Sequence, residues 1–314
     1  MRVLIAGATG VAGIPLVARL MTAGHEVVGI VRGLAGVDRL GELGASSVTA
    51  DVLDRDALLL ATERVEANAV ISDLTALRKA PLHHSDMRGT NVLRTVGTAN
   101  LLDVARQVGA DRFVTQSMVF GYGYRDLGTA PLTEDAPFGV PQHDAFDEHL
   151  VAMASNERQA FSADGIDGIA VRYGLLYGAD LATIVTMLRH RTLPSARTGG
   201  RLAWVHHSDA ASATVAALEH GTGGEAYNVV DDTSVTFREV LDEIAAAAGA
   251  PRPFALPDWV LRMMAPYGAA MMDGVSMLVS NEKARRELGW APRYPSIREG
   301  VAASAAQLAA PAHR

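Results

Sequence analysis

The fold is decided by the first stretch of the chain, RVLIAGATGVAGIPLVARLMTAG at residues 2–24. It opens with an apolar run typical of a buried strand, and its second half has apolar side chains at helical spacing until Gly24. Glycines at every third position between these halves let the backbone turn sharply and approach a diphosphate at the helix N-terminus. The stretch therefore predicts a dinucleotide-binding turn. The turn residues that we expect to contact the nucleotide are Gly7, Thr9, Gly10, Val11 and Gly13.

Strand and helix patterns continue to alternate after this turn. Further strands are expected at HEVVGIVR (25–32), SSVTADV (46–52), EANAVISDLT (66–75), DRFVTQSMVFGYG (111–123) and IDGIAVRYGLLYG (166–178). The segment at 90–110 is predicted to be one long amphipathic helix with Val92 and Val96 on its apolar face. Apolar strands that alternate with helices are typical of a parallel sheet covered on both faces.

These patterns predict an α/β fold, a doubly wound parallel Rossmann sheet with a smaller α/β C-terminal substrate lobe. Residues 1–172 would form the dinucleotide-binding domain, and residues 173–314 would form mainly the substrate-binding lobe. Short strand patterns in the second part lead us to expect that the chain returns to the first domain near 205–230.

Composition limits the partners of the protein. Of its 314 residues 49% are hydrophobic and 20% are charged, which is ordinary for a soluble protein with a sizeable core. The net charge is -7 and the 28 Lys and Arg residues are scattered, so we expect no nucleic acid and no membrane as partner. We also expect a cytoplasmic location, since a membrane span or signal peptide is not apparent. Cysteine is absent. No metal site is expected, although HDAFDEH at 143–149 gathers histidines and aspartates.

The ends of the next strands predict which nucleotide is bound. An acidic residue after the second strand would bind both ribose hydroxyls of NAD, but this strand ends in Arg32. A guanidinium suits a 2′-phosphate, so we expect NADP, with NAD and a merely exposed arginine as the alternative. Asp51, followed by Val52, is placed to accept from the adenine amino group. Leu74 and Thr75 are expected to end the fourth strand and line a ribose.

Several motifs resemble the extended short-chain dehydrogenase/reductases of the NAD-dependent epimerase/dehydratase type. They run in the family's order from residue 1 to about 300: GATGVAG (7–13), TNVLRTVGTANLLDVA (90–105), DRFVTQSMVFGYG (111–123), AVRYGLLYG (170–178) and SNEKARRELGWAPRY (280–294). The resemblance implies an enzyme that acts on a hydroxyl or carbonyl of a small molecule, such as a sugar nucleotide or secondary metabolite. It also implies a possible homodimer through the helices at 90–108 and 146–162.

The family's catalytic pair is missing from this chain. Members usually use a serine or threonine, a tyrosine as acid/base, and a lysine four residues later on the same helix face. Glu157 resembles the glutamate that often follows that lysine by four residues, which puts Met153 at the lysine and His149 at the tyrosine. Tyr173 stands where the family commonly has proline, and its backbone should run beside the nicotinamide.

Other residues could replace the missing pair. His149 is a candidate because histidine has an unperturbed pKa of ~6.5, which suits proton transfer at neutral pH. The alternative is a buried helix histidine with satisfied hydrogen bonds. Ser117 matches the family's hydroxyl donor, although another register puts Met118 there. Tyr122 or Tyr124 could supply a phenolic proton from the cleft, or could simply pack at its mouth.

Three functions are compatible with these residues. The first is an NADP-dependent oxidoreductase or epimerase/dehydratase-like enzyme with a non-standard acid/base. The second is a redox-neutral isomerase, cyclase or lyase on the same fold, and the third is a non-catalytic NADP(H)-binding regulatory protein. We rank the first ahead because the chain keeps both its glycine loop and a full substrate lobe.

Overall fold

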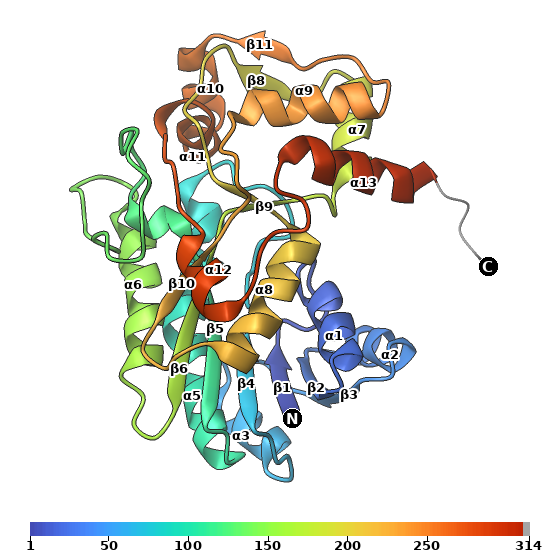
Figure 1. Cartoon of the computed structure of the whole chain (residues 1–314), viewed down its shortest axis with the longest axis vertical. Coiled ribbons are helices and arrows are strands. Elements are labelled where there is room, and N and C mark those ends of the chain that lie inside the picture. The colour runs from blue at the N-terminus through green and yellow to red at the C-terminus, as the bar shows by residue number, and fades with distance from the viewer. Residues whose placement is uncertain (310–314) are drawn as a thin grey trace.

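The computed structural model describes residues 1–309, and its centre is a sheet of parallel strands. The strands are β1 (Arg2–Ala6), β2 (Glu26–Val31), β3 (Ser46–Thr49), β4 (Ala69–Ser72), β5 (Arg112–Met118), β6 (Asp167–Tyr173) and β10 (Ala226–Val229). Their order across the sheet is β10-β6-β5-β4-β1-β2-β3, and every neighbouring pair is parallel (Figure 1). The order reverses direction at β1, so the prediction of a doubly wound α/β sheet is confirmed.

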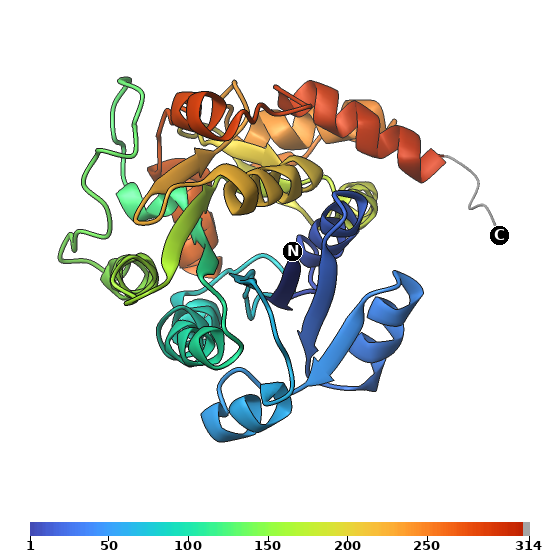
Figure 2. The same cartoon turned by 60° about the horizontal axis from the view of Figure 1, so that its bottom comes forward.

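Helices cover both faces of the sheet (Figure 2). One face carries α1 (Gly13–Thr22), α2 (Leu34–Glu42), α8 (His207–His220) and α12 (Glu282–Leu288), and the other carries α3 (Arg55–Thr62), α5 (Thr98–Gln107) and α6 (Asp147–Phe161). Each face has its own apolar core. Leu16 and Leu20 of α1 are buried in the first core, and Leu101 and Val104 of α5 are buried in the second. The buried side chains recur at the three- and four-residue spacing that first predicted these helices.

The helix before β5 contains a π-helical turn. It consists of α4 (Arg88–Val92), the π-turn η2 (Leu93–Gly97) and then α5. Val92 is 42% exposed and Val96 is 46% exposed, so the prediction that they lie on the apolar face is wrong. A π turn takes more residues than an α turn, and it therefore changes which side chains face the core.

The C-terminal lobe lies above the carboxyl ends of the strands in Figure 1. Its elements are β7 (Leu175–Tyr177), α7 (Leu181–Arg189), β8 (Pro194–Ala196), β9 (Trp204–His206), α9 (Phe237–Ala247), β11 (Phe254–Leu256), α10 (Asp258–Met264), α11 (Pro266–Ala269), η4 (Ala270–Gly274) and α13 (Ile297–Ala309). Two small parallel pairs, β7 with β9 and β8 with β11, brace it. The core of this lobe continues into Leu150 and Met153 of α6. Within residues 1–309, the helices lack the length and apolar character that crossing a membrane requires.

Candidate cofactor and substrate site

The turn between β1 and α1 is built so tightly that only glycine fits at its two ends. A Cβ at Gly7 would lie 2.0 Å from the carbonyl oxygen of Asp73, and Gly7 has a φ of +94°. A Cβ at Gly13 would lie 2.1 Å from the carbonyl oxygen of Gly7. Between them, the N–H of Gly10 donates to the carbonyl of Gly7 at 2.9 Å and closes the turn. The glycines therefore hold a bare backbone surface at the start of α1.

This surface offers free donors to an anion. The N–H groups of Val11 and Ala12 have no hydrogen-bond acceptor among the residues that the structure describes. Val11 is 64% exposed, and Thr9 is half-buried beside it. Free N–H groups at a helix N-terminus carry partial positive charge and bind phosphate. The turn thus fits the diphosphate of a dinucleotide.

Arg32 and Asp51 follow two neighbouring strands at this same edge. Arg32 comes directly after β2, is exposed, and lies near the end of β3, since Val31 pairs with Thr49. The Oδ1 atom of Asp51 accepts from the N–H of Leu53 at 3.0 Å, which leaves Oδ2 for a ligand. Val52 is buried, and its carbonyl accepts from Asn100 of α5 at 2.8 Å. Two charged groups therefore flank the end of the sheet where the adenosine half would lie.

The end of β4 differs from the prediction. The strand ends at Ser72, so the expectation that Leu74 and Thr75 end it is wrong. The next residue, Asp73, already packs its backbone carbonyl against Gly7 of the glycine turn. Leu74 is half-buried, and Thr75 is exposed, with its Oγ1 atom 3.3 Å from that of Thr90.

Asp73 was missed by sequence reasoning. Its side chain is buried, its Oδ1 atom has no partner among residues 1–309, and burial raises the pKa of its carboxyl to about 7. The signal was present in SDLT, where an acidic residue directly follows an apolar strand.

The helix α6 presents positions 149, 153 and 157 on one buried face. His149 and Met153 are both 0% exposed. One turn further on, Glu157 binds Arg172 of β6 through both oxygens, at 2.9 and 2.7 Å. This ion pair fixes the helix against the sheet, and it therefore fixes where the imidazole of His149 lies.

The imidazole of His149 is hydrogen-bonded at both nitrogens. The side-chain amide of Asn91 donates to Nδ1 at 2.9 Å, and Nε2 lies 3.1 Å from Nδ1 of His84. Because Asn91 can only donate from its Nδ2 atom, this network assigns the proton of the neutral ring to Nε2. Burial first, and then the charge of His84, lower the pKa of His149 to about 4. The ring is therefore neutral at neutral pH.

His149 belongs to a group of rings that we call the aromatic cluster, made up of His84, Tyr124, Phe146, His149 and Tyr267. Ring centroids lie 4.3 Å apart for Tyr124 and Phe146, and 5.5 Å apart for His149 and Tyr267. Tyr267 comes from α11, and its N–H donates to the carbonyl of Leu82 at 2.9 Å, just before the turn η1 (His84–Met87). The C-terminal lobe therefore closes over α6 at this cluster.

Arg94 of η2 brings a positive charge to the cluster. The side chain is half-buried, and its Nη1 atom is buried with no partner among the described residues. Burial lowers the pKa of Arg94, while charge interactions with Tyr124 and Tyr267 oppose that shift. Arg94 in turn contributes to the lowered pKa of His149. Sequence reasoning missed Arg94, because an arginine within a helix usually faces solvent.

Ser117 lies on the face of β5 that packs on α6. Thr115, two residues earlier and so on the same face, donates to Asn156 of α6 at 2.7 Å. Ser117 is 0% exposed, and its Oγ atom has no hydrogen-bond partner within the described chain. The structure thus directs Ser117, rather than Met118, toward the helix that carries His149. Its role as a hydroxyl donor stays a prediction.

Tyr122 and Tyr173 are held by the core. The hydroxyl of Tyr122, in the turn η3 (Val119–Tyr122), donates to Asn228 at 2.8 Å and accepts from Arg172 at 2.9 Å, and burial raises its pKa to about 12. This bonding favours the packing alternative for Tyr122. The hydroxyl of Tyr173 contacts that of Thr214, so its ring points into the core and only its backbone can border a ligand.

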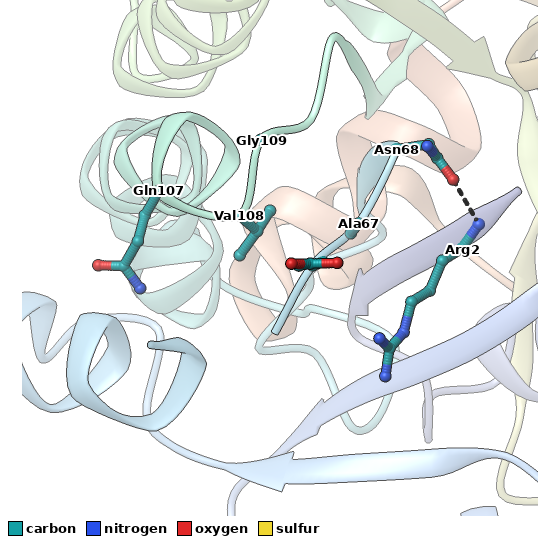
Figure 3. A pocket seen from close by; sticks show the side chains of 7 residues that line it. Arg2, Ala67, Asn68, Gln107, Val108 and Gly109 are labelled. Carbon is teal, nitrogen blue, oxygen red and sulfur yellow. Dashed lines mark hydrogen bonds between the residues drawn. The ribbon is translucent and has the colours of Figure 1, made fainter. Parts of the chain in front are cut away.

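A separate pocket of about 520 Å³ opens at the other end of the sheet, near the amino ends of the strands (Figure 3). It is lined by Arg2, Glu66, Ala67, Asn68, Gln107, Val108 and Gly109. There the N–H of Arg2 donates to Asn68 at 2.8 Å. These residues precede β1, β4 and β5 or open them, whereas ligands of open α/β sheets bind beyond the carboxyl ends of the strands. The pocket therefore lies on the wrong side of the sheet to belong to this site.

Comparison with known proteins agrees with this geometry. Residues 3–230 match the family described as NAD dependent epimerase/dehydratase. The chain is 36% identical over 313 residues to a 3-diazoavenalumate denitrifying reductase of Streptomyces sp, and the match covers 96% of this chain and 99% of that protein.

Solved structures share the fold. A UDP-glucose 4-epimerase of Thermus thermophilus in complex with NAD has a TM-score of 0.78 at 24% identity, and the match covers 98% of both chains. The human epimerase family protein SDR39U1 with NADPH has a TM-score of 0.78 at 23% identity, and the match covers 98% of this chain and 99% of that one. One of these neighbours holds NAD and the other NADPH.

Proposed function

The chain belongs to the NAD-dependent epimerase/dehydratase family and is an enzyme of the short-chain dehydrogenase/reductase type that uses a nicotinamide cofactor, and from that premise we propose that it is an NADPH-dependent reductase of aromatic diazo compounds. One observation carries the proposal. The two helix positions that we assign to the family's tyrosine and lysine hold a neutral, fully hydrogen-bonded His149 and a buried Met153.

These two residues are poorly suited to reactions at a carbonyl or hydroxyl. Reduction of a carbonyl leaves an alkoxide that needs a proton, and oxidation of a hydroxyl needs a base. Met153 carries no charge and no donor. His149 already uses both ring nitrogens, and its pKa of about 4 leaves it unprotonated. The site favours a hydride acceptor that requires no such proton.

A diazo group is an acceptor of this kind. Bound NADPH supplies a hydride, so that an aryldiazonium ion and NADPH give the arene, N₂ and NADP⁺, with atoms and charge balanced and no external proton consumed. Here the chain has to orient a planar ring and exclude water, and the aromatic cluster and the buried Met153 are suited to both tasks. The relative from Streptomyces, which is 36% identical, bears a name that states reduction of a diazo compound with loss of nitrogen.

Arg32 supports NADP as the form of the cofactor. Its exposed guanidinium directly follows β2, at the place where a 2′-phosphate would lie if the diphosphate binds the glycine turn. Asp51 and the backbone after β4 would border the rest of the nucleotide.

Exposed valines support the expected homodimer. Val92 and Val96 on the α4–η2 helix and Val151 on α6 are 42%, 46% and 49% exposed. Both helices belong to the segments through which the resemblance implies pairing. We propose that they form an isologous interface, which light scattering after size-exclusion chromatography would test by mass.

The reductase proposal can be tested with two substrates of matched shape. Diazotised 3-amino-4-hydroxycinnamate and 3-acetyl-4-hydroxycinnamate are each mixed with protein and NADPH, and near-ultraviolet absorbance and released N₂ are followed together. We expect N₂ and oxidised NADPH in a one-to-one ratio from the diazo compound only. A sample without protein corrects for direct reduction by NADPH, and Gly13→Ala should behave like that sample.

Three results would contradict the proposal. Oxidation of NADPH by the ketone but not by the diazo compound would indicate an ordinary carbonyl reductase. Conversion of either compound without oxidation of NADPH would indicate a redox-neutral enzyme. Binding of NADPH without any turnover would favour the non-catalytic regulatory protein.

A further inference from the structure

We infer that Arg94 binds a carboxylate of the substrate inside the aromatic cluster. The inference rests on the proposed function, because it places the substrate ring against His149. It adds the chemical class of the substrate: an aromatic acid whose carboxylate pairs with a guanidinium from the η2 turn.

The first observation is that one nitrogen of the half-buried Arg94 side chain is buried without a partner. Its Nη1 atom is buried, and no hydrogen bond or ion pair to it is found in the described part of the chain. A buried guanidinium nitrogen without an acceptor is costly, so folds normally supply one. Arg172 shows this in the same protein, because Glu157 binds it through two bonds and the ring of Phe138 lies 3.8 Å from it.

The second observation is that no nearby carboxylate of the described chain takes this role. Glu148 is close enough to raise the pKa of His149, but it is exposed and its Oε1 atom accepts from Asn91 at 3.4 Å. Burial lowers the pKa of Arg94, and no carboxylate of the described chain is among the groups that oppose this shift. An anion at this nitrogen would therefore come from a ligand.

The third observation is the donor set around the guanidinium. The hydroxyls of Tyr124 and Tyr267 lie 3.4 Å apart, and burial raises the pKa of both, so that both remain protonated donors. Arg94 follows Asn91, whose amide bonds His149, by three residues in the same helical segment. A planar guanidinium together with two phenols would suit the two oxygens of a carboxylate. The rings of the aromatic cluster would hold the aromatic body attached to it.

The test starts with Arg94→Met, because stability and binding should change in opposite directions. Removing an unpaired buried charge should raise the melting temperature of the free protein, since methionine fills much of the same space. A purely structural arginine predicts the reverse, a lower melting temperature. Arg88→Met, an exposed position earlier on the same helix, serves as the matched control.

Binding is measured by calorimetry on protein saturated with NADP⁺. The probes are 4-hydroxycinnamate and its neutral amide. Wild type and Arg88→Met should prefer the carboxylate by roughly 10- to 100-fold. In Arg94→Met the two probes should bind alike, while Arg94→Lys should recover part of the preference because it keeps the charge but not the planar fork.

Several outcomes would overturn the inference. They are equal binding of acid and amide to wild type, no binding of the acid at millimolar concentration, or an unchanged preference in Arg94→Met. Weaker NADP⁺ binding in Arg94→Met with the acid preference intact would assign the arginine to the cofactor.

Failure of the inference and failure of the proposed function are distinguishable. Equal reduction of the diazotised acid and its diazotised amide would leave the reductase standing without the carboxylate site. Preferential binding of the acid without any reduction of the diazo compound would leave the carboxylate site standing without the reductase.

Discussion

Replacing His149 by glutamine should make the protein less sensitive to acid. The pKa of His149 is lowered from 6.5 to about 4, chiefly by burial. In the unfolded chain this residue therefore binds a proton below about pH 6.5. In the folded chain it binds one only below about pH 4. Stability from this group is complete above pH 6.5 and is lost as the pH falls toward 4. A shift of this size corresponds to about 3 kcal/mol of unfolding free energy.

The assay is urea unfolding of both proteins, followed by tryptophan fluorescence, from about pH 7 to about pH 4.5. Other titrating groups, including Asp73, are common to both proteins and cancel in the difference. The stability advantage of wild type over His149→Gln should fall by about 2–3 kcal/mol across this range. His220→Gln, whose side chain is 58% exposed, controls for the loss of a histidine as such. A difference that does not change with pH would refute the buried neutral imidazole.

Three further changes probe the cofactor site and the helix α6, which carries His149. Gly13→Ala should abolish NADPH binding in calorimetry, because the new Cβ would lie 2.1 Å from a backbone oxygen, whereas Gly41→Ala meets no described atom within 4 Å and should bind normally. Arg32→Ala should weaken NADPH by about 1.5–3 kcal/mol and leave NADH unchanged; an intact preference for NADPH would disprove the 2′-phosphate role. Glu157→Gln should lower the unfolding free energy by about 3–5 kcal/mol, because Arg172 is left buried and unpaired, and a loss under about 1 kcal/mol would count against this reasoning.

The glycine turn could be predicted from sequence because its requirements are local. Gly7 and Gly13 are needed by backbone contacts within the turn and to the next strand end, and these follow from the strand–turn–helix pattern alone. That His149 and Glu157 share one buried helix face could also be predicted, from their eight-residue spacing, while the assignment of His149 to the family's tyrosine stays a prediction. Its protonation state could not, because the imidazole depends on Asn91 and His84, which lie 58 and 65 residues away in the chain.

Arg94 and Tyr267 escaped prediction for different reasons. Arg94 lies in a π turn, and the helical periodicity used to read the segment at 90–110 assumes a regular α-helix, which also misplaced Val92 and Val96. Tyr267 reaches the cluster from α11 through tertiary packing alone, 118 positions after His149 in the numbering. Local sequence patterns carry no information on a contact between residues so far apart in the chain.

The contact between α11 and the segment before η1 joins the two segments that bring Tyr267 and His84 to the aromatic cluster. Backbone N–H groups of Tyr267 and Gly268 both donate to the carbonyl of Leu82, at 2.9 and 3.3 Å. The imidazole of His149 has no exposed surface. Any molecule that contacts the ring of His149 would therefore have to displace neighbouring side chains of the aromatic cluster. If this displacement requires the hydrogen bonds to Leu82 to open, variants that strengthen the contact would gain rigidity and lose speed. Under the proposed function, the same enclosure would shield a reactive diazo compound from hydrolysis while it is bound.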